Sequence, residues 1–316
     1  MSTPAKLTSL KSKVAIVTGA GGGLGREYAL LLASYGATIV VNDYGGSIGG
    51  DRGTIDRAQL VVDEITAAGG KASADAHDVS IPEEVEAMVQ ETVMKYGTIH
   101  ILINNAGIAG KASSHDNLNV DSYLRHLQIS TFGTILCISK VYSIMEKQGY
   151  GRIINTSSDS IYGMGIGGDT GYCSSKGGVF AMTRDLGRFS PRHGIKINSI
   201  APSAVSRMSD LSPLIKKISH EHFATNLVAY FVVALASEEC PVSGEQFSVG
   251  GGRAARTTLA TVPGYCGGES VEDYLQNFDA VLGKGNDVYI PVDCLDQVSY
   301  SIRHATGIDL GKIEPM

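Results

Sequence analysis

Short apolar runs alternate along this chain with longer segments in which apolar residues recur every three or four positions. A short buried run is typical of a strand in a parallel sheet, and the longer period is typical of an amphipathic helix. The pattern predicts strands at 13–18, 38–42, 71–78, 100–105, 152–157, 195–200 and 245–251. It predicts helices at 24–36, 57–70, 82–97, 119–148, 172–190 and 227–236. This alternation indicates an α/β fold with a doubly wound parallel sheet of the Rossmann type.

The strand–helix pattern fades after about residue 254. We therefore expect one domain over 11–253 and a C-terminal extension over 254–316. The extension contains one predicted helix near 270–282 and an otherwise irregular tail. We expect it to pack on the same domain or on a neighbouring subunit, where Tyr289, Ile290 and Tyr300 could cover a cleft.

The bulk composition excludes two classes of partner. The 316 residues carry a net charge of −6, and no basic stripe appears, so we expect no nucleic-acid partner. The most apolar run, at 227–236, is ten residues long and too short to span a bilayer. We interpret it as a buried core helix and predict no membrane span.

The cysteines and the N-terminus bear on the compartment. Five cysteines lie far apart without a C-x-x-C pair, which favours free thiols over a disulfide framework or a zinc site. The first 13 residues lack the apolar core of a signal peptide. We predict a cytoplasmic protein that binds no metal.

A glycine-rich loop, "TGAGGGLG" at 18–25, joins the first predicted strand to the first predicted helix. Glycines let a backbone approach a pyrophosphate, and the N-terminus of a helix offers unpaired N–H groups and a positive dipole end. A glycine run alone is often only a turn, but its position after the first strand indicates dinucleotide binding. The residues expected at the cofactor are Gly19, Gly21, Gly23, Leu24 and Gly25.

Two further strand ends carry polar residues that suit a cofactor. Asp43 ends the second strand, where a carboxylate can accept hydrogen bonds from the adenosine ribose and would repel a 2′-phosphate. This favours NAD over NADP. The alternative interpretation of Asp43 is a solvated acidic residue in a loop, with no role in binding. The sequence "NNAG", which includes Asn105, Ala106 and Gly107, closes the strand at 100–105 and suits close packing against the cofactor.

Tyr172 lies four residues before Lys176 within a predicted helix, so both side chains point the same way. A nearby ammonium group favours phenolate and would lower the pKa of the tyrosine toward neutral pH. The pair therefore suits general acid/base chemistry, although the Y-x-x-x-K pattern also occurs by chance.

Four motifs follow one another along the chain: T-G-x-x-x-G-x-G at 18–25, N-N-A-G at 104–107, Ser158, and Y-x-x-x-K at 172–176. In this order they resemble the short-chain dehydrogenase/reductase family over roughly residues 11–252. The resemblance implies that Tyr172 is the acid/base, that Lys176 holds the nicotinamide ribose, and that Ser158 bonds the substrate oxygen. It also implies that the cofactor is held by Asp43 at the adenosine ribose, Asp78 and Val79 at the adenine, Asn105 in the cleft, and Pro202 and Val205 at the nicotinamide.

Two departures from the family pattern affect the site. The serine-to-tyrosine spacing is fourteen from Ser158 instead of thirteen, and Asp159 stands at the usual spacing. We favour Ser158, because a hydroxyl can donate to a developing alkoxide whereas a carboxylate would repel it. Ser130 stands where the family has an asparagine that relays protons. The sequence therefore does not determine the route by which a proton passes from Lys176 to solvent.

The stretches 17–46, 150–158 and 197–208 resemble one member group of the family more closely, and this group implies two substrate classes. One is a 17β-hydroxysteroid, as in the conversion of estradiol to estrone, and the other is a (3R)-hydroxyacyl-CoA. Cations that could meet CoA phosphates, or merely be solvated, are Arg207, Lys216 and Lys217. An apolar approach wall that would suit a steroid consists of Ile161, Tyr162, Met164 and Ile166.

We therefore predict an NAD-dependent dehydrogenase that acts on the CH–OH group of a bulky apolar small molecule. The steroid is the first choice and the acyl-CoA the alternative. The family resemblance implies a homodimer or homotetramer. A non-catalytic NAD-binding protein is the rival from another class, and it would be expected to have lost Tyr172 or Lys176.

Overall fold

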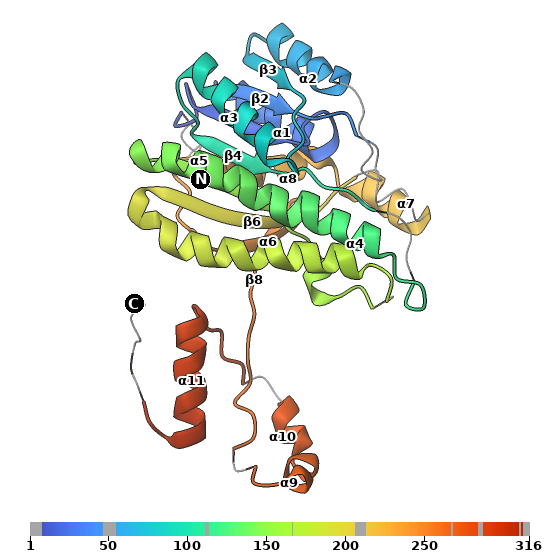
Figure 1. Cartoon of the computed structure of the whole chain (residues 1–316), viewed down its shortest axis with the longest axis vertical. Helices are drawn as coiled ribbons and strands as arrows, with labels where there is room; N and C mark the ends of the chain where they lie inside the picture. Colours follow the sequence, from blue (N-terminus) through green and yellow to red (C-terminus); the bar gives the residue numbers. More distant parts are fainter. Residues whose placement is uncertain are drawn as a thin grey trace, which may run out of the picture. The chain divides into compact units, whose positions relative to one another are not determined.

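The computed structural model describes residues 8–46, 55–110, 114–165, 167–205, 213–266, 268–283, 287–309 and 311, with side chains omitted for 213–215. Its centre is one eight-stranded sheet in the order β3-β2-β1-β4-β5-β6-β7-β8 (Figure 1). The pairings from β3 through β7 are all parallel. The strands are β1 Val14–Thr18, β2 Thr38–Asn42, β3 Lys71–Asp75, β4 Ile101–Asn104, β5 Gly151–Thr156, β6 Ile195–Ser203, β7 Gln246–Gly250 and β8 Arg253–Thr257.

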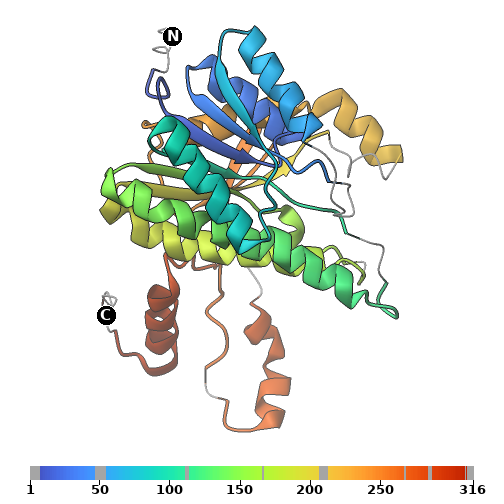
Figure 2. The ribbon, with the colours of Figure 1, turned by 45° about the horizontal axis from the view of Figure 1, so that its top comes forward.

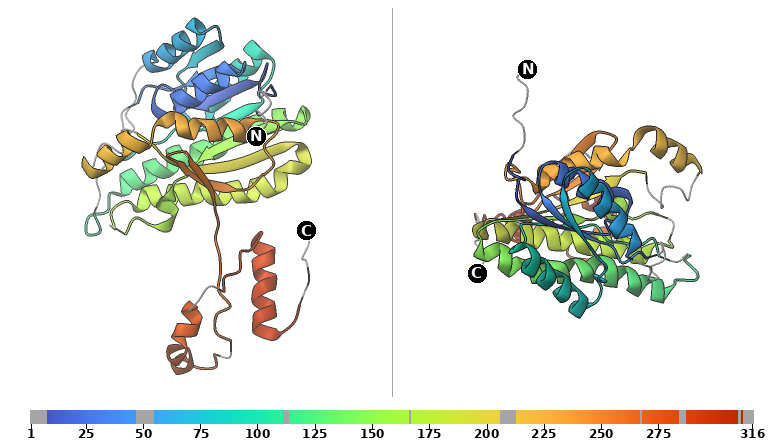
Figure 3. Two further views of the ribbon diagram at one scale, coloured as in Figure 1. Left: turned by 180° about the vertical axis from the view of Figure 1, so that it is seen from behind. Right: turned by 90° about the horizontal axis from the view of Figure 1, so that it is seen from above.

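Helices cover both faces of the sheet, which confirms the doubly wound fold (Figures 1 and 3). One face buries apolar residues of α1 (Gly23–Ser34), α2 (Asp56–Ala67) and α8 (Thr225–Ala236). The other packs against α3 (Pro82–Tyr96), α5 (Gly133–Lys147) and α6 (Thr170–Phe189). The predicted core helix at 227–236 is α8. Strand order reverses between β1 and β4, and in open α/β sheets ligands bind at this switch point.

The predicted helical stretch at 119–148 is confirmed as a continuous helix over Val120–Lys147. Its middle is a π-helical segment, η1 (Leu127–Phe132), between α4 (Val120–His126) and α5, which the sequence pattern does not predict. Its wider turn brings Thr131 against α6, where the Thr131 hydroxyl donates to the carbonyl oxygen of Ser175 at 2.9 Å. Such π-segments occur frequently at functional sites.

The stretch Val120–Lys147 is the one part of the described chain that is helical, long and apolar enough to cross a bilayer by length and composition. Its apolar residues Cys137, Ile138, Val141 and Met145 are instead buried against the sheet. The arrangement is that of a core helix, with α5 and α6 side by side beneath the sheet (Figure 2).

The C-terminal part contains more structure than predicted. A further strand, β8, follows β7 after two glycines, and the helix predicted at 270–282 is divided into α9 (Val271–Gln276) and α10 (Phe278–Leu282). The tail predicted as irregular contains α11 (Cys294–Thr306), which begins where the Asp293 carboxylate accepts a hydrogen bond from the Asp296 backbone N–H at 2.9 Å.

The chain divides into two compact units, Met1–Arg256 and Thr257–Met316. Within the second unit the rings of Tyr289 and Tyr300 are stacked, with 4.1 Å between their centres, and Tyr300 is buried. The proposal that this extension covers a cleft remains a prediction.

Candidate active site

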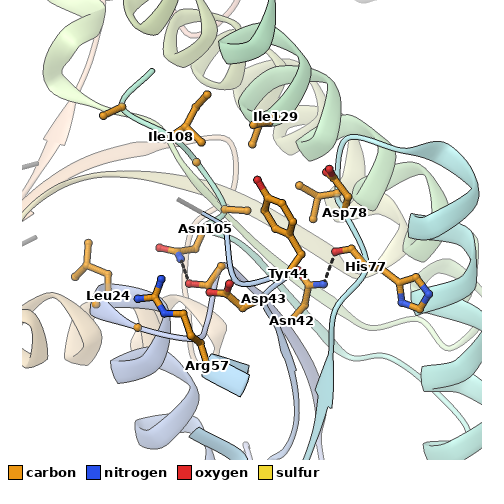
Figure 4. A pocket seen from close by; sticks show the side chains of 18 residues that line it. Leu24, Asn42, Asp43, Tyr44, Arg57, His77, Asp78, Asn105, Ile108 and Ile129 are labelled. Carbon is orange, nitrogen blue, oxygen red and sulfur yellow. Dashed lines mark hydrogen bonds between the residues drawn. The ribbon is translucent and has the colours of Figure 1, made fainter. Parts of the chain in front are cut away.

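A cavity of about 240 Å³ opens at the carboxyl ends of β1, β2 and β4. Figure 4 shows Asp43 and Arg57 at one end of it and Ile108 and Ile129 at the other. The predicted cofactor residues that line it are Gly19, Gly23, Leu24, Asp43, Asp78, Val79, Asn105, Ala106 and Gly107. The structure thus gathers three separate sequence motifs around one cavity.

The glycine loop is held against β4 by Asn105. The Asn105 side-chain amide donates to the carbonyl oxygens of Thr18 and Gly19, both at 3.0 Å. A Cβ atom at Gly25 would lie 2.4 Å from the Gly19 carbonyl oxygen, so only glycine allows this close approach. Gly19 itself has a φ of +63°, a left-handed conformation that favours glycine.

Helix α1 begins next to this loop without a side-chain cap, since its N-cap residue is Gly22. Among the described residues no side chain accepts from its first N–H groups, and Gly22, Gly23 and Leu24 line the cavity. Unpaired N–H donors and the positive end of a helix dipole suit a pyrophosphate. The residues present therefore fit the phosphate portion of a dinucleotide.

Asp43 accepts hydrogen bonds from the backbone N–H of Gly21 at 2.8 Å and of Gly45 at 2.7 Å. These bonds hold its carboxylate at the cavity wall beside Arg57. A Cβ atom at Gly21 would lie 2.7 Å from Asp43 Oδ2 and 2.8 Å from Arg57 Cβ, so both side chains meet at this point. Sequence reasoning missed Arg57, and its place in the first turn of the helix after β2 was the available signal.

The opposite wall of the cavity is formed by Asp78 and Val79. The Asp78 carboxylate accepts from the Ser80 backbone N–H at 2.8 Å and from the Ser80 hydroxyl at 2.6 Å. Arg125 of α4 lies 3.5 Å from the same carboxylate. Val79 is buried, so an apolar and a polar surface stand side by side where the family resemblance implies the adenine.

Tyr172 lies in the first turn of α6, and the Ser158 hydroxyl is near enough to its phenol to lower the pKa of Tyr172. Ser158 is half-buried and begins the short 3-10 helix η2 (Asp159–Tyr162), where it also accepts from the Ser160 backbone N–H at 3.1 Å. Asp159 is exposed and instead accepts from the Ser248 hydroxyl at 3.0 Å. This geometry supports Ser158 over Asp159 as the partner of Tyr172.

Lys176 is almost fully buried, and its Nζ atom donates to the carbonyl oxygen of Thr156 at 2.8 Å. The same atom lies 5.7 Å from the centre of the Tyr172 ring. Burial lowers the pKa of Lys176 to about 8. The two residues therefore share one face of α6, as their spacing predicts.

The expected direction of the tyrosine shift is wrong for this structure. Burial raises the pKa of Tyr172 above its ordinary value and outweighs the hydrogen bond from Ser158, which lowers it. The spacing of Tyr172 and Lys176 shows that a cation is near, but it does not show how far the phenol is removed from water.

Ser130 is buried within η1, and its hydroxyl has no hydrogen-bond partner among the described residues. A Cβ atom at Gly107 would lie 3.8 Å from Ser130 Oγ and 3.7 Å from Lys176 Nζ, so both groups face the same point. Sequence reasoning missed His126, whose buried ring makes an edge contact with the Tyr172 ring at 5.7 Å between centres.

The remaining predicted residues lie outside the walls of the 240 Å³ cavity. Pro202 pairs with Val249 at the carboxyl end of β6, and the Val205 backbone N–H donates to the Phe223 carbonyl oxygen at 2.9 Å. Tyr162 and Met164 are exposed at 68% and 51% of their surface and follow Ser158 along the chain. Ile166 and Arg207 lie outside the described residues.

Comparisons with known proteins agree with this geometry. The family model for short chain dehydrogenases matches residues 13–217. The chain is 37% identical over 268 residues to the peroxisomal multifunctional enzyme type 2 of Drosophila melanogaster, a match that covers 83% of this chain and 42% of that protein. It is 32% identical over 251 residues to a cyclohexanol dehydrogenase of an Acinetobacter species, covering 76% of this chain and 94% of that one.

The solved structure of a short chain dehydrogenase from Mycobacterium avium superposes with a TM-score of 0.75 at 31% identity. The match covers 88% of this chain and 97% of that one. Members of this family use NAD or NADP and act on small-molecule CH–OH groups. The chain belongs to the short-chain dehydrogenase/reductase family and is an oxidoreductase of that type.

Proposed function

We propose that this protein uses NAD to interconvert a secondary alcohol and its ketone, with Tyr172 as general acid/base. The observation that carries the proposal is that Tyr172 has Lys176 on the same face of α6 and the Ser158 hydroxyl near enough to its phenol to lower the pKa of that phenol. A phenol and a hydroxyl that converge on one point can both bond the oxygen of a bound alcohol.

In the oxidation direction, Tyr172 takes the hydroxyl proton of the substrate, and Ser158 donates to the oxygen as negative charge develops there. Lys176 supports the phenolate with its positive charge. When bound, the nicotinamide accepts the hydride. The residues expected to hold the cofactor are those of the glycine loop, Asp43, Asp78, Val79 and Asn105, which line or support the cavity.

NAD is the proposed cofactor, because the Asp43 carboxylate stands at the cavity wall where the adenosine ribose would lie. Its negative charge would repel a 2′-phosphate. Pro202 and Val205 are proposed to border the nicotinamide.

For the substrate we propose a bulky apolar ring alcohol, with a 17β-hydroxysteroid as the first choice. Tyr162 and Met164 expose large apolar side chains just after Ser158. Gly163 and Gly165 adopt left-handed conformations, with φ of +80° and +72°, which favour glycine and shape this segment. The similarity to a cyclohexanol dehydrogenase supports a secondary alcohol carried on a ring.

A (3R)-hydroxyacyl-CoA is the second candidate. The similarity to a peroxisomal multifunctional enzyme favours it, and helix α7 (Pro213–His222) carries exposed Lys216 and Lys217, whose charges could meet CoA phosphates.

Turnover assays test these proposals. The enzyme would be incubated with NAD or NADP and with estradiol, cyclohexanol or (3R)-hydroxydecanoyl-CoA while reduced nicotinamide is followed by absorbance. Turnover of estradiol with NAD supports the first choice, whereas turnover of the acyl-CoA alone supports the second. Cofactor binding without turnover of any secondary alcohol would favour the non-catalytic rival.

We also propose an assembly and a cellular location. Family members typically oligomerise, so we propose a homodimer or homotetramer. Light scattering should then show a species heavier than 33.2 kDa at micromolar concentration. All five cysteines are free, which supports a reducing compartment such as the cytoplasm. Cell fractionation would distinguish this location from the peroxisome of the Drosophila relative.

A further inference from the structure

Arg57 lines the 240 Å³ cavity, and its guanidinium has no hydrogen bond or ion pair with any other residue that the structure describes. It is half-buried and is the second residue of α2. The neighbouring arginines are engaged: Arg26 of α1 pairs with Glu27 and Glu64, and Arg125 of α4 pairs with Asp78. The positive charge of Arg57 is therefore available to an anionic ligand in the cavity.

The side chain of Arg57 runs along the glycine loop toward the start of α1. A Cβ atom at Gly21 would lie 2.8 Å from Arg57 Cβ, and a Cβ atom at Gly22 would lie 3.0 Å from Arg57 Nη2. Gly22 is the N-cap residue of α1, so the guanidinium stands beside the positive end of that helix. Two separate elements, α1 and α2, thus present N–H donors and positive charge to one part of the cavity.

Asp43 does not neutralise this charge. Its Oδ2 atom accepts from the Gly21 backbone N–H at 2.8 Å, and its Oδ1 atom accepts from the Gly45 backbone N–H at 2.7 Å. Both carboxylate oxygens are held by the backbone, and the described side chains include no ion pair between Asp43 and Arg57. Figure 4 shows the two residues at the same end of the cavity, where they offer opposite charges to a ligand.

We propose that Arg57 binds the diphosphate of the dinucleotide cofactor through its guanidinium, beside the N-terminus of α1. The inference rests on the proposed function, which places the cofactor in this cavity. A guanidinium presents its N–H groups as a planar fork that matches two oxygens of a phosphate. Arg57 then adds affinity for NAD and NADP alike, whereas Asp43 sets the preference between them by repelling negative charge at the ribose.

Calorimetric titration of the full chain tests the proposal with NAD, ADP and adenosine as the probes. Arg57→Gln should raise the dissociation constants for NAD and ADP about tenfold, because each loses a charged hydrogen bond. The dissociation constant for adenosine, which has no phosphate, should stay within about twofold. Arg57→Lys keeps the charge and loses the fork, so its effect should be smaller than that of Arg57→Gln. An equal loss for ADP and adenosine, or no loss for either, would overturn the proposal.

Arg26→Gln is the matched control. Arg26 is also half-buried, but its charge is engaged by Glu27 and Glu64, and it is not one of the cavity-lining residues. This variant should leave all three dissociation constants within about twofold. The gap between wild type and Arg57→Gln for ADP should also narrow when the salt concentration rises from about 0.05 M to about 0.5 M, because salt screens charge. A gap that is unaffected by salt would indicate a packing role and would overturn the proposal.

NADP distinguishes the diphosphate from a 2′-phosphate as the group that Arg57 binds. The proposal expects Arg57→Gln to weaken NAD and NADP by similar factors. Loss of affinity for NADP with unchanged affinity for NAD would assign Arg57 to the 2′-phosphate and overturn the proposal. Thermal melting without ligand checks that each variant is folded.

These titrations contain no alcohol, so they separate this inference from the proposed function. If no alcohol is turned over while Arg57→Gln still weakens ADP selectively, the proposed function fails and the role of Arg57 stands. If an alcohol is turned over while Arg57→Gln binds NAD and ADP as the wild type does, the role of Arg57 fails and the proposed function stands.

Discussion

Lys176 holds its ammonium group 5.7 Å from the centre of the Tyr172 ring and donates its hydrogen bond to the carbonyl oxygen of Thr156, not to the phenol. The lysine is therefore fixed by β5, and in the proposed function its charge supports the phenolate from this distance. Ser158 follows the same strand by two residues, and its hydroxyl acts to lower the pKa of the phenol. The candidate site thus combines a phenol, a neighbouring hydroxyl and a fixed ammonium group.

Tyr172→Phe should lower kcat by about 10²–10⁴-fold, because it removes the proton donor and keeps the ring. The dissociation constant for NAD should change little, since the described cavity walls do not include Tyr172. Steady-state turnover and a fluorescence titration with reduced nicotinamide check the two parts. Activity within a few-fold of the wild type would refute the assignment.

Ser158→Ala and Asp159→Ala form a matched pair at adjacent positions. Ser158→Ala should lower kcat by about 10²-fold, as expected for loss of a donor to the developing oxyanion. Asp159 is exposed and bonded to Ser248, so Asp159→Ala should stay within about twofold. The opposite order in the measured kcat values would assign the role to Asp159.

The fold could be predicted because parallel strands that are buried on both faces appear in the sequence as runs of apolar residues, such as "VAIVT" and "TIVVN". Strand β8, "RAART", was missed because its exposed edge position removes the apolar signal. The π-segment around Ser130 was missed because its residues still follow a helical period. The local apolar pattern therefore predicts the core strands and helices, but it does not predict the edge strand or the π-helical segment.

The parts of the candidate site that depend on residue types and their spacing could be predicted from the sequence. The properties that depend on tertiary packing could not. The proximity of Tyr172 and Lys176 follows from their spacing, but the raised pKa of Tyr172 follows from its burial. Arg57 and His126 reach the site from helices whose sequences carry no motif. Their neighbours Asp43 and Tyr172 are distant in the sequence, so only the folded chain brings them together.

Asp43→Ala should relax cofactor choice and raise the efficiency with NADP relative to NAD by roughly 10²-fold, because it removes a repulsion worth several kcal/mol. The guanidinium of Arg57 would then be available to a 2′-phosphate, since Arg57 lines the cavity and a Cβ atom at Gly22 would lie 3.0 Å from its Nη2. The double variant Asp43→Ala, Arg57→Ala should lose most of this gain. Values of kcat/KM for the two cofactors measure both effects.

A wild type with equal kcat/KM for NAD and NADP would contradict the role given to Asp43. Arg57→Ala alone is the control, and it should leave the preference for NAD intact or strengthen it.

The buried Lys176 should make stability depend on pH. Its pKa falls from an ordinary 10.5 to about 8 in the folded chain. Between these values the unfolded chain holds a proton that the folded chain has lost, so the contribution of Lys176 to the free energy of unfolding rises with pH. Below pH 8 the folded chain bears the cost of a buried ammonium, and this cost is removed as pH approaches 10.5.

Urea denaturation of the cofactor-free wild type and Lys176→Met at pH 7 and pH 10 measures this effect. Relative to Lys176→Met, the wild type should gain roughly 2–3 kcal/mol between the two pH values, since each unit of pKa difference corresponds to about 1.4 kcal/mol. The exposed Lys147, replaced by methionine in the same way, serves as the control and should show no such gain. A constant difference between wild type and Lys176→Met at both pH values would mean that the lysine keeps its proton in the folded chain throughout this range. The charge beside Tyr172 would then persist in alkaline solution, and any loss of kcat there would have to arise from another group.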